Sequence, residues 1–289
     1  MQRPPEFEFL ATPRAKLGES PVWSVREDCL WWVDIEGRSV FRTGGADGAT
    51  QVWRTPEMAG VVAPTGGDGV VVVGMESGLF RLDTSSGRFT RAAALEAGNM
   101  RFNDAAVDSR GRLWAATMEH DYRRPAGVLY RIDPDLSMHA VAGGFFIPNG
   151  LAVDEKRGRI YVSDSHPDLQ IVWTADLDPE SGRLGERRVF ARFQDLAGRP
   201  DGAAIDAESN YWIAGVEGAC LHVFSPSGEH IGAHAVPVAA PTKIAFGGPD
   251  LSRLYLTSKA DGGEGGRLAV AHPGVMGRAG TPFGGAGWG

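Results

Sequence analysis

The chain has 289 residues, of which 43 % are apolar and 22 % charged, as in a soluble globular protein with a sizeable core. Its net charge of −7 and the lack of any Lys/Arg run argue against a nucleic-acid partner. No segment approaches the roughly 18 apolar residues of a membrane-spanning helix. Residues 1–20 also lack an apolar signal-peptide core, and the two cysteines lie in unrelated contexts. We therefore expect a cytoplasmic protein, with no membrane partner, that is a monomer or a small homo-oligomer.

The first predicted element is a short strand at residues 6–11. It is followed by six copies of an apolar strand, each preceded by a turn and rich in Val, Ile, Trp and Tyr. The copies are residues 30–33, 70–73, 113–116, 160–163, 211–214 and 254–257. Their first residues lie 40, 43, 47, 51 and 43 positions apart, which is close to the length of one four-stranded propeller blade.

This spacing predicts an all-β fold, a six-bladed β-propeller with four-stranded blades, formed by residues 1–289 as a single domain. A ring of blades must close, because otherwise its end blades expose strand edges. We expect residues 6–11 to pair with residues 268–271 of the last blade and close the ring. The Gly-rich C-terminal tail, about residues 274–289, is expected to be a flexible surface arm, because no strand–helix context supports a phosphate loop.

The first strand of each blade lines the central channel, so residues at the start of these strands should meet at one mouth. About ten to twelve residues before each apolar strand, the same repeat position is occupied by Glu19, Gly60, Asn103, Asn149, Asp201 and Thr242. Two carboxylates in a narrow channel would repel each other unless a cation lay between them. Their oxygens suit Mg²⁺, Ca²⁺ or Mn²⁺ better than a structural zinc site.

These residues predict a divalent cation bound by Glu19, Asn149 and Asp201, with waters or Asn103 completing the coordination. The alternative is that Asn149-Gly and Asp201-Gly are only tight-turn dipeptides. The agreement in register across the repeats favours the metal site. Residues 163–166, Ser-Asp-Ser-His, combine residue types of a catalytic triad but are contiguous in sequence, so we interpret them as a polar blade loop.

Several motifs, in order along nearly the whole chain, resemble the regucalcin/gluconolactonase family, also called the senescence-marker-protein family. They are Leu17–Trp23 (LGESPVW), Arg101–Asp104 (RFND), Val107-Asp108, Gly111–Trp114 (GRLW), Thr117-Met118, Pro148–Leu151 (PNGL), Pro200–Gly202 (PDG), Ile205-Asp206 and Phe246–Gly248 (FGG). The resemblance implies a six-bladed propeller that hydrolyses a sugar lactone with one divalent metal ion. The identity of the ion, among Ca, Zn, Mn, Mg and Fe, stays open.

By matching position, the resemblance implies that Glu19, Asn149 and Asp201 are the metal ligands and that Asp201 is also the general base. Arg101 and Asn103 would contact the substrate. An acidic residue after Thr-Met contacts substrate in some members, and Glu119 is the candidate here. The same resemblance leaves the role of the loop around Arg123 and Arg124 open.

Two other functions remain possible on this scaffold, because a fold does not determine a function. One is a different metal-dependent esterase, such as an organophosphate or aryl-ester hydrolase, which a large apolar mouth would favour. The other is a non-enzymatic calcium-binding propeller, which a bound metal without lactone turnover would favour.

Overall fold

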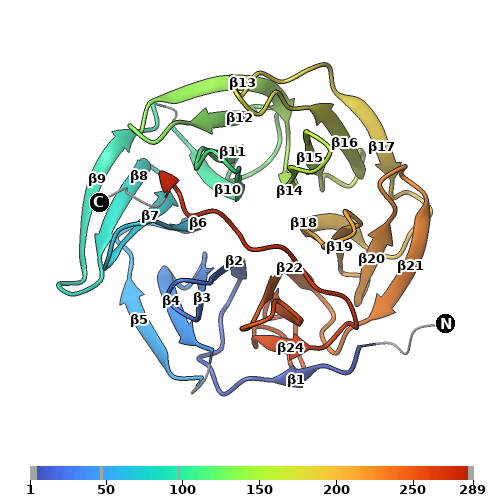
Figure 1. Ribbon diagram of the computed structural model, residues 1–289, viewed down its shortest axis with the longest axis horizontal. Coiled ribbons are helices and arrows are strands. Elements are labelled where there is room, and N and C mark those ends of the chain that lie inside the picture. Colours follow the sequence, from blue (N-terminus) through green and yellow to red (C-terminus); the bar gives the residue numbers. More distant parts are fainter. Residues whose placement is uncertain (1–4, 46–47, 97, 286–289) are drawn as a thin grey trace.

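The computed structural model describes residues 5–45, 48–96 and 98–285. Within these ranges the chain forms 24 strands and no α-helix. The strands make six four-stranded antiparallel sheets arranged as blades around a central axis (Figure 1). This confirms the predicted six-bladed β-propeller.

The first three blades contain β2 (Gly18–Ser24), β3 (Cys29–Asp34), β4 (Ser39–Gly44) and β5 (Thr50–Arg54); β6 (Ala59–Pro64), β7 (Val70–Met75), β8 (Gly78–Asp83) and β9 (Arg88–Ala94); and β10 (Met100–Val107), β11 (Leu113–Glu119), β12 (Gly127–Ile132) and β13 (Met138–Phe145). The next two contain β14 (Pro148–Asp154), β15 (Arg159–Asp164), β16 (Ile171–Asp176) and β17 (Arg188–Arg192); and β18 (Arg199–Ile205), β19 (Tyr211–Val216), β20 (Cys220–Phe224) and β21 (His230–Ala235). The last contains β22 (Pro241–Gly247), β23 (Arg253–Ser258), β24 (Ala269–Ala271) and β1 (Glu8–Phe9).

The N-terminal strand closes the ring, as predicted. Strand β1 pairs antiparallel with β24, with Glu8 opposite Val270 and Phe9 opposite Ala269. It is shorter than the predicted residues 6–11, but it supplies the outermost strand of the sixth blade. The last blade is thus built from both ends of the chain, so the ring cannot open without breaking this pairing.

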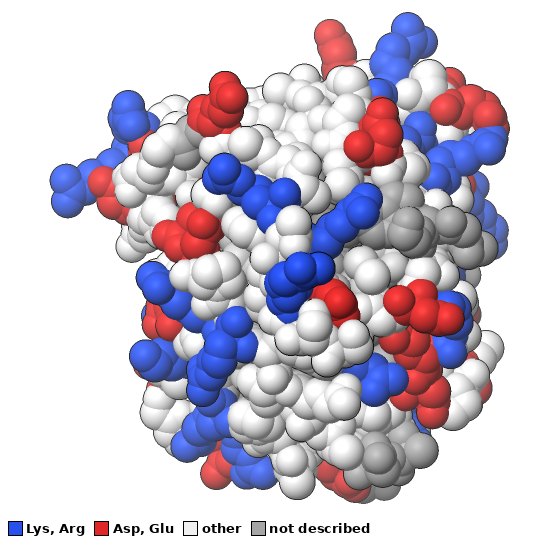
Figure 2. Space-filling model, turned by 90° about the vertical axis from the view of Figure 1, so that its left-hand side faces the viewer, with Lys and Arg blue, Asp and Glu red and all other residues white. Residues whose placement is uncertain are grey.

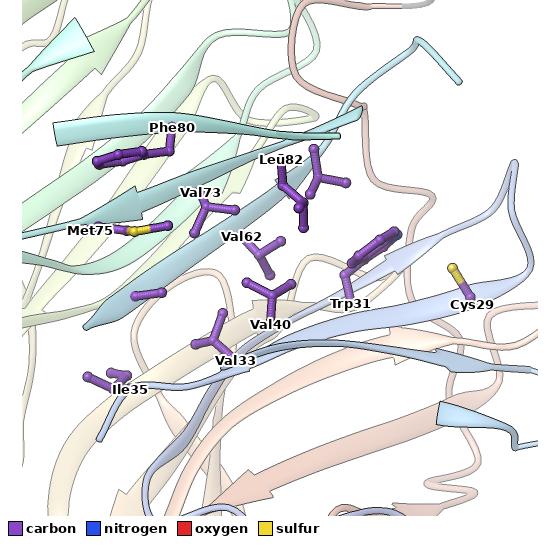
Figure 3. Packing of buried hydrophobic residues seen from close by; sticks show 12 residues of the cluster. Cys29, Trp31, Val33, Ile35, Val40, Val62, Val73, Met75, Phe80 and Leu82 are labelled. Carbon is purple, nitrogen blue, oxygen red and sulfur yellow. The ribbon is translucent and has the colours of Figure 1, made fainter. Parts of the chain in front are cut away.

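The hydrophobic core is divided into six clusters, one at each interface between neighbouring blades. Figure 3 shows the interface of the first two blades, where Trp31 and Val33 on β3 face Val62 and Val73 on β6 and β7. The Trp residues of the repeated apolar strands are at most 3 % exposed, so they pack between blades as expected. Each blade is therefore held mainly by its two neighbours, which makes the arrangement of the inner strands rigid.

The C-terminal tail is not the flexible surface arm that the sequence suggested. Its described part crosses the middle of the ring in Figure 1, where it is drawn in red. Arg278 bonds the Asp154 carboxylate at 3.1 Å, and the Phe283 N–H bonds the Pro64 carbonyl at 2.8 Å. The Phe283 ring is fully buried in the cluster between the second and third blades. The prediction of a flexible arm failed because a high glycine content indicates backbone freedom but says nothing about the residues between the glycines that anchor the segment. Residues 286–289 of the predicted tail lie outside the described ranges.

The tail lies across the end of the channel where the inner strands finish. A cavity of about 220 Å³ there is lined by the later halves of five inner strands and by residues 278–281 of the tail. The inner strands begin at the opposite mouth, away from this cavity.

Charged side chains of both signs share the face of the molecule in Figure 2. Acidic and basic residues are interspersed there. Some surface charges are paired, as are Arg26 with Asp68 at 2.7 Å and Arg188 with Asp176 at 2.6 Å. No helix in the described part of the chain is long and apolar enough to span a bilayer.

Candidate metal and active site

Every inner strand is bulged at, or directly after, the repeat position that the sequence singled out. In the third blade, Phe102 pairs with Thr117 and Asp104 with the next residue, Ala116, so Asn103 is an extra residue in its strand. Equivalent shifts follow Glu19, Ala59, Asn149, Pro200 and Pro241 in the other five blades. A β-bulge kinks a strand and redirects its side chains. The repeat thus places one bulge per blade at the same mouth.

The bulged strands exclude a tight hairpin turn at the Asn-Gly and Asp-Gly pairs. Asn149 lies within β14 and Asp201 within β18, so neither pair forms a hairpin turn. Gly150 has φ 62°, and a Cβ there would lie 2.5 Å from the Tyr211 hydroxyl. A Cβ at Gly202 would lie 2.3 Å from Cβ of Lys243. Both glycines are therefore required by close contacts in the channel wall.

The structure gathers the predicted residues at this mouth and buries them. Glu19, Asn103, Asn149 and Asp201 are only 5–8 % exposed. Asn103 bridges two blades, since its Nδ2 donates to Asn149 Oδ1 at 2.9 Å. Arg101 Nη1 in turn donates to Asn103 Oδ1 at 2.6 Å. The other two repeat positions are Gly60 and Thr242, and the Thr242 hydroxyl bonds the Gly18 carbonyl at 2.5 Å.

The two buried carboxylates at the mouth both have raised pKa values. Burial, followed by the charge of Asp104, raises the pKa of Glu19 from 4.5 to about 7. Burial, followed by the charge of Glu19, raises the pKa of Asp201 well above its ordinary value. The Asp201 carboxylate accepts no hydrogen bond from any residue in the described ranges, and that of Glu19 accepts one, from the Ser20 N–H at 2.9 Å. Two buried, underbonded carboxylates are what a cation would stabilise.

The oxygen set fits a hard divalent cation. Glu19 and Asp201 provide charge and Asn149 provides an amide oxygen, which is the donor chemistry of Ca²⁺, Mg²⁺ and Mn²⁺ sites. Among the described residues, no three His, Cys, Asp or Glu side chains form a group that could hold a metal. A site here would therefore depend on the amide as its third protein ligand.

The raised pKa of Glu19 predicts an effect of pH on the cation-free protein. Between about pH 4.5 and about 7 the unfolded chain ionises Glu19 while the folded chain keeps it protonated. The unfolded state then binds fewer protons, so this group lowers the free energy of unfolding as the pH rises through that window. Chemical denaturation in chelator should therefore show Glu19→Gln gaining stability relative to wild type from pH 4.5 to 7. A constant difference between the two proteins would contradict the buried, raised carboxyl.

Beneath the mouth, a buried ion pair crosses the channel. Lys243 Nζ bonds the Asp104 carboxylate and, at 2.9 Å, the Ala105 carbonyl. The other oxygen of Asp104 accepts the Leu151 N–H at 2.7 Å. Lys243 thus compensates the Asp104 charge and partly offsets its effect on the pKa of Glu19. Asp104 and Lys243 each follow a repeat position in the sequence, but no sequence pattern predicted that they would form an ion pair.

Two further acidic residues hold the segments that lead into the inner strands. Asp34 accepts the N–H groups of Lys16 and Leu17 at 2.9 and 3.0 Å. Asp164 likewise accepts those of Phe146 and Ile147 at 2.8 and 3.1 Å. Leu17 and Ile147 each lie two residues before a predicted ligand. Asp34 and Asp164 both end the second strand of their blades. This shared repeat position was the sequence signal that could have identified the two residues.

Glu119 lies at the same mouth but is not one of the six repeat positions. It ends β11, where Met100 and not Arg101 is its cross-strand partner. Its carboxylate is buried and paired with Arg124. Close by, His120 pairs with Glu76 at 3.2 Å. The loop thus forms a charged and polar rim above the inner strands.

Two motif residues near the opposite end of the channel have structural roles. Asp108 accepts a hydrogen bond from the Trp114 indole at 2.9 Å, and Asp206 accepts one from the Trp212 indole at 2.9 Å. Both carboxylates also accept backbone N–H groups of their own turns. They fix the turn between the first two strands of a blade and are remote from the mouth that holds Asp201.

The chain matches a known protein family over the strands that form this site. The family model for the SMP-30/gluconolactonase/LRE-like region matches residues 17–260. The chain belongs to this family. The match spans the six inner strands and therefore all the residues gathered at the mouth, and it confirms the resemblance drawn from the sequence motifs.

Relatives within the SMP-30/gluconolactonase family are similar over most of their length. A 6-deoxy-6-sulfogluconolactonase of Pseudomonas putida is 36 % identical over 247 residues, which cover 85 % of this chain and 84 % of that protein. A pentonolactonase of Haloferax volcanii is 33 % identical over 251 residues, covering 86 % and 84 %. The structure of a regucalcin from Agrobacterium tumefaciens, described as a calcium-binding protein, has a TM-score of 0.89 at 26 % identity and covers 98 % of this chain and 97 % of its own.

Proposed function

We propose that the protein hydrolyses a sugar lactone, of the gluconolactone-like aldonolactone type, to the sugar acid with the aid of one divalent cation. The observation that carries the proposal is that two buried carboxylates, Glu19 and Asp201, lie at one mouth of the channel and accept only one hydrogen bond from the described residues, that of the Ser20 N–H to Glu19. The names of the relatives support the substrate class, since two of them are sugar lactonases. The regucalcin described as calcium-binding supports the cation.

In this proposal Glu19, Asn149 and Asp201 hold the cation. When bound, such an ion polarises a carbonyl oxygen and acidifies a water molecule. Asp201 is positioned to accept the proton of the attacking water, because its carboxylate has no hydrogen-bond donor among the described residues. That proton then passes to the ring oxygen as the ester C–O bond breaks, giving the open hydroxy acid.

Arg101 and Asn103 orient the substrate in this proposal. Burial lowers the pKa of Arg101 to about 10, which still leaves the guanidinium charged at neutral pH. Its charge and fixed geometry suit the hydroxyls and the developing negative charge of a lactone. Glu119 contributes to the substrate side of the mouth through its pair with Arg124. The rim there, with His120, is polar, which favours a sugar over an aryl ester.

The protein is further proposed to act in the cytoplasm. Cys29 and Cys220 are both free and buried, which suits a reducing compartment. The expected small-molecule substrate requires neither a nucleic acid nor a membrane.

A lactone panel tests the proposed function. Metal-stripped protein should show no turnover by proton release on aldonolactones, and adding back Ca²⁺, Mg²⁺, Mn²⁺, Zn²⁺ or Fe²⁺ singly should restore it with at least one ion. The same ion should raise the melting temperature, since binding to the folded state adds about 2.7 kcal/mol of stability at 100 times the Kd. Full turnover in excess chelator would refute the cation requirement, and no turnover on any lactone would refute the activity.

A further inference from the structure

A continuous chain of hydrogen bonds runs through the mouth from Arg101 to the backbone beside Asp201. After Arg101 and Asn103 it reaches Asn149, whose Nδ2 donates to Ser165 Oγ at 2.9 Å. The Ser165 hydroxyl then donates to the Pro200 carbonyl. The chain therefore links three blades and passes through one of the proposed ligands.

Elementary chemistry fixes the direction of every bond in this chain. A guanidinium can only donate, so the Asn103 atom next to Arg101 must be its oxygen. A peptide carbonyl can only accept, so Ser165 must give its single proton to Pro200. Ser165 Oγ can then only accept from Asn149, which must turn its NH₂ toward the serine. The Asn103 amide has the orientation that this chain requires, because its NH₂ also donates to the Pro148 carbonyl at 2.8 Å.

We propose that Ser165 is a positioning residue, which holds the Asn149 amide with Oδ1 toward the cation and the NH₂ group away from it. The inference rests on the proposed function, because it concerns one of the proposed ligands. An amide that turns by 180° presents an NH₂ group to the cation in place of an oxygen, and that group cannot bind it. Of the two lone pairs on Asn149 Oδ1, the hydrogen bond from Asn103 uses one and leaves the other for the ion.

Ser165 is itself held in place. It is 2 % exposed, its N–H donates to the Ile147 carbonyl at 2.9 Å, and its carbonyl accepts from Arg199 Nη1 at 2.9 Å. A hydroxyl fixed in this way selects one amide orientation before any ion arrives. Removing such a partner of a metal ligand typically costs about 10–100-fold in metal affinity.

Calorimetric titration of the metal-stripped protein with Ca²⁺ or Mn²⁺ tests the inference without measuring turnover. Ser165→Ala should bind the cation about 10–100-fold more weakly than wild type. Ser163→Ala is the matched control, because its hydroxyl approaches the same Pro200 carbonyl, at 3.4 Å, and bonds no ligand. It should bind the cation as wild type does. A Ser165→Ala variant with unchanged affinity would overturn the role of Ser165.

The Asn149→Asp background separates orientation from a merely structural effect. A carboxylate presents an oxygen in either orientation, so adding Ser165→Ala to Asn149→Asp should cause no further loss of affinity. An equal loss in both backgrounds would show that Ser165 only supports the fold, and would overturn the inference. Wild-type protein that binds no cation would instead refute the proposed function itself, which distinguishes the two failures.

Discussion

Replacing Asp201 with Asn is expected to lower kcat for lactone hydrolysis by about 10²–10⁴-fold, the usual contribution of a general base. The amide keeps an oxygen that can bind the cation but cannot accept the proton of water. The variant should therefore retain measurable cation while losing turnover, whereas Asp201→Ala should lose both. Steady-state kinetics together with elemental analysis of metal content would measure the two effects separately.

A control for this experiment lies on the segment that leads into the same strand. Asp195 is exposed and six residues before Asp201, and Asp195→Asn should leave both metal content and rate unchanged. If Asp201→Asn turned lactone over at the wild-type rate, Asp201 would not be the base, and the water would be activated by the cation alone or by Glu19.

Replacing Lys243 with Met is expected to lower the free energy of unfolding by about 3–5 kcal/mol, because it leaves Asp104 charged and buried without its partner. The side chains of Lys243 and Asp104 are only 5 % and 1 % exposed, so bulk solvent does not solvate the carboxylate that is left. Urea denaturation of wild type and variant at one pH, with chelator present, would measure the difference.

The second substitution Asp104→Asn should recover most of that loss. It removes the uncompensated charge and keeps an oxygen for the Leu151 N–H, which lies 2.7 Å from the carboxylate in wild type. If Lys243→Met unfolded like wild type, the pair would contribute no net stability. If Asp104→Asn failed to rescue it, the loss would come from packing of the lysine stem against Gly202 and not from charge.

The fold and the meeting of the candidate site residues at one mouth were predictable because the propeller repeats a local pattern. The spacing of the apolar strands reports blade length, and the repeat position before each strand reports the inner strand. The repeat alone therefore predicted that one mouth would hold Asn103, Asn149 and Asp201, with no knowledge of three-dimensional contacts. The closing strand was also predictable, since an unpaired edge at both ends of the chain leaves only one way to complete the ring.

The remaining features depend on contacts between blades, which no local pattern reports. The Lys243–Asp104 pair joins the sixth blade to the third, and Ser165 acts across the boundary between the fourth and fifth. Ser165 was visible in the sequence only as part of a polar loop. The tail was misjudged for the same reason, because the pocket that receives Phe283 is formed by the second and third blades, far away in sequence.

A crystal structure of the protein loaded with Mn²⁺, with its anomalous scattering measured, would test the central claim most directly. We predict one strong anomalous peak at the mouth of the channel, within about 2.0–2.6 Å of oxygens from Glu19, Asn149 and Asp201, the range for hard divalent cations. The Asn149 amide should keep its NH₂ on Ser165. The absence of a peak there in Mn²⁺-saturated crystals, or a peak bound only by other residues, would contradict the account.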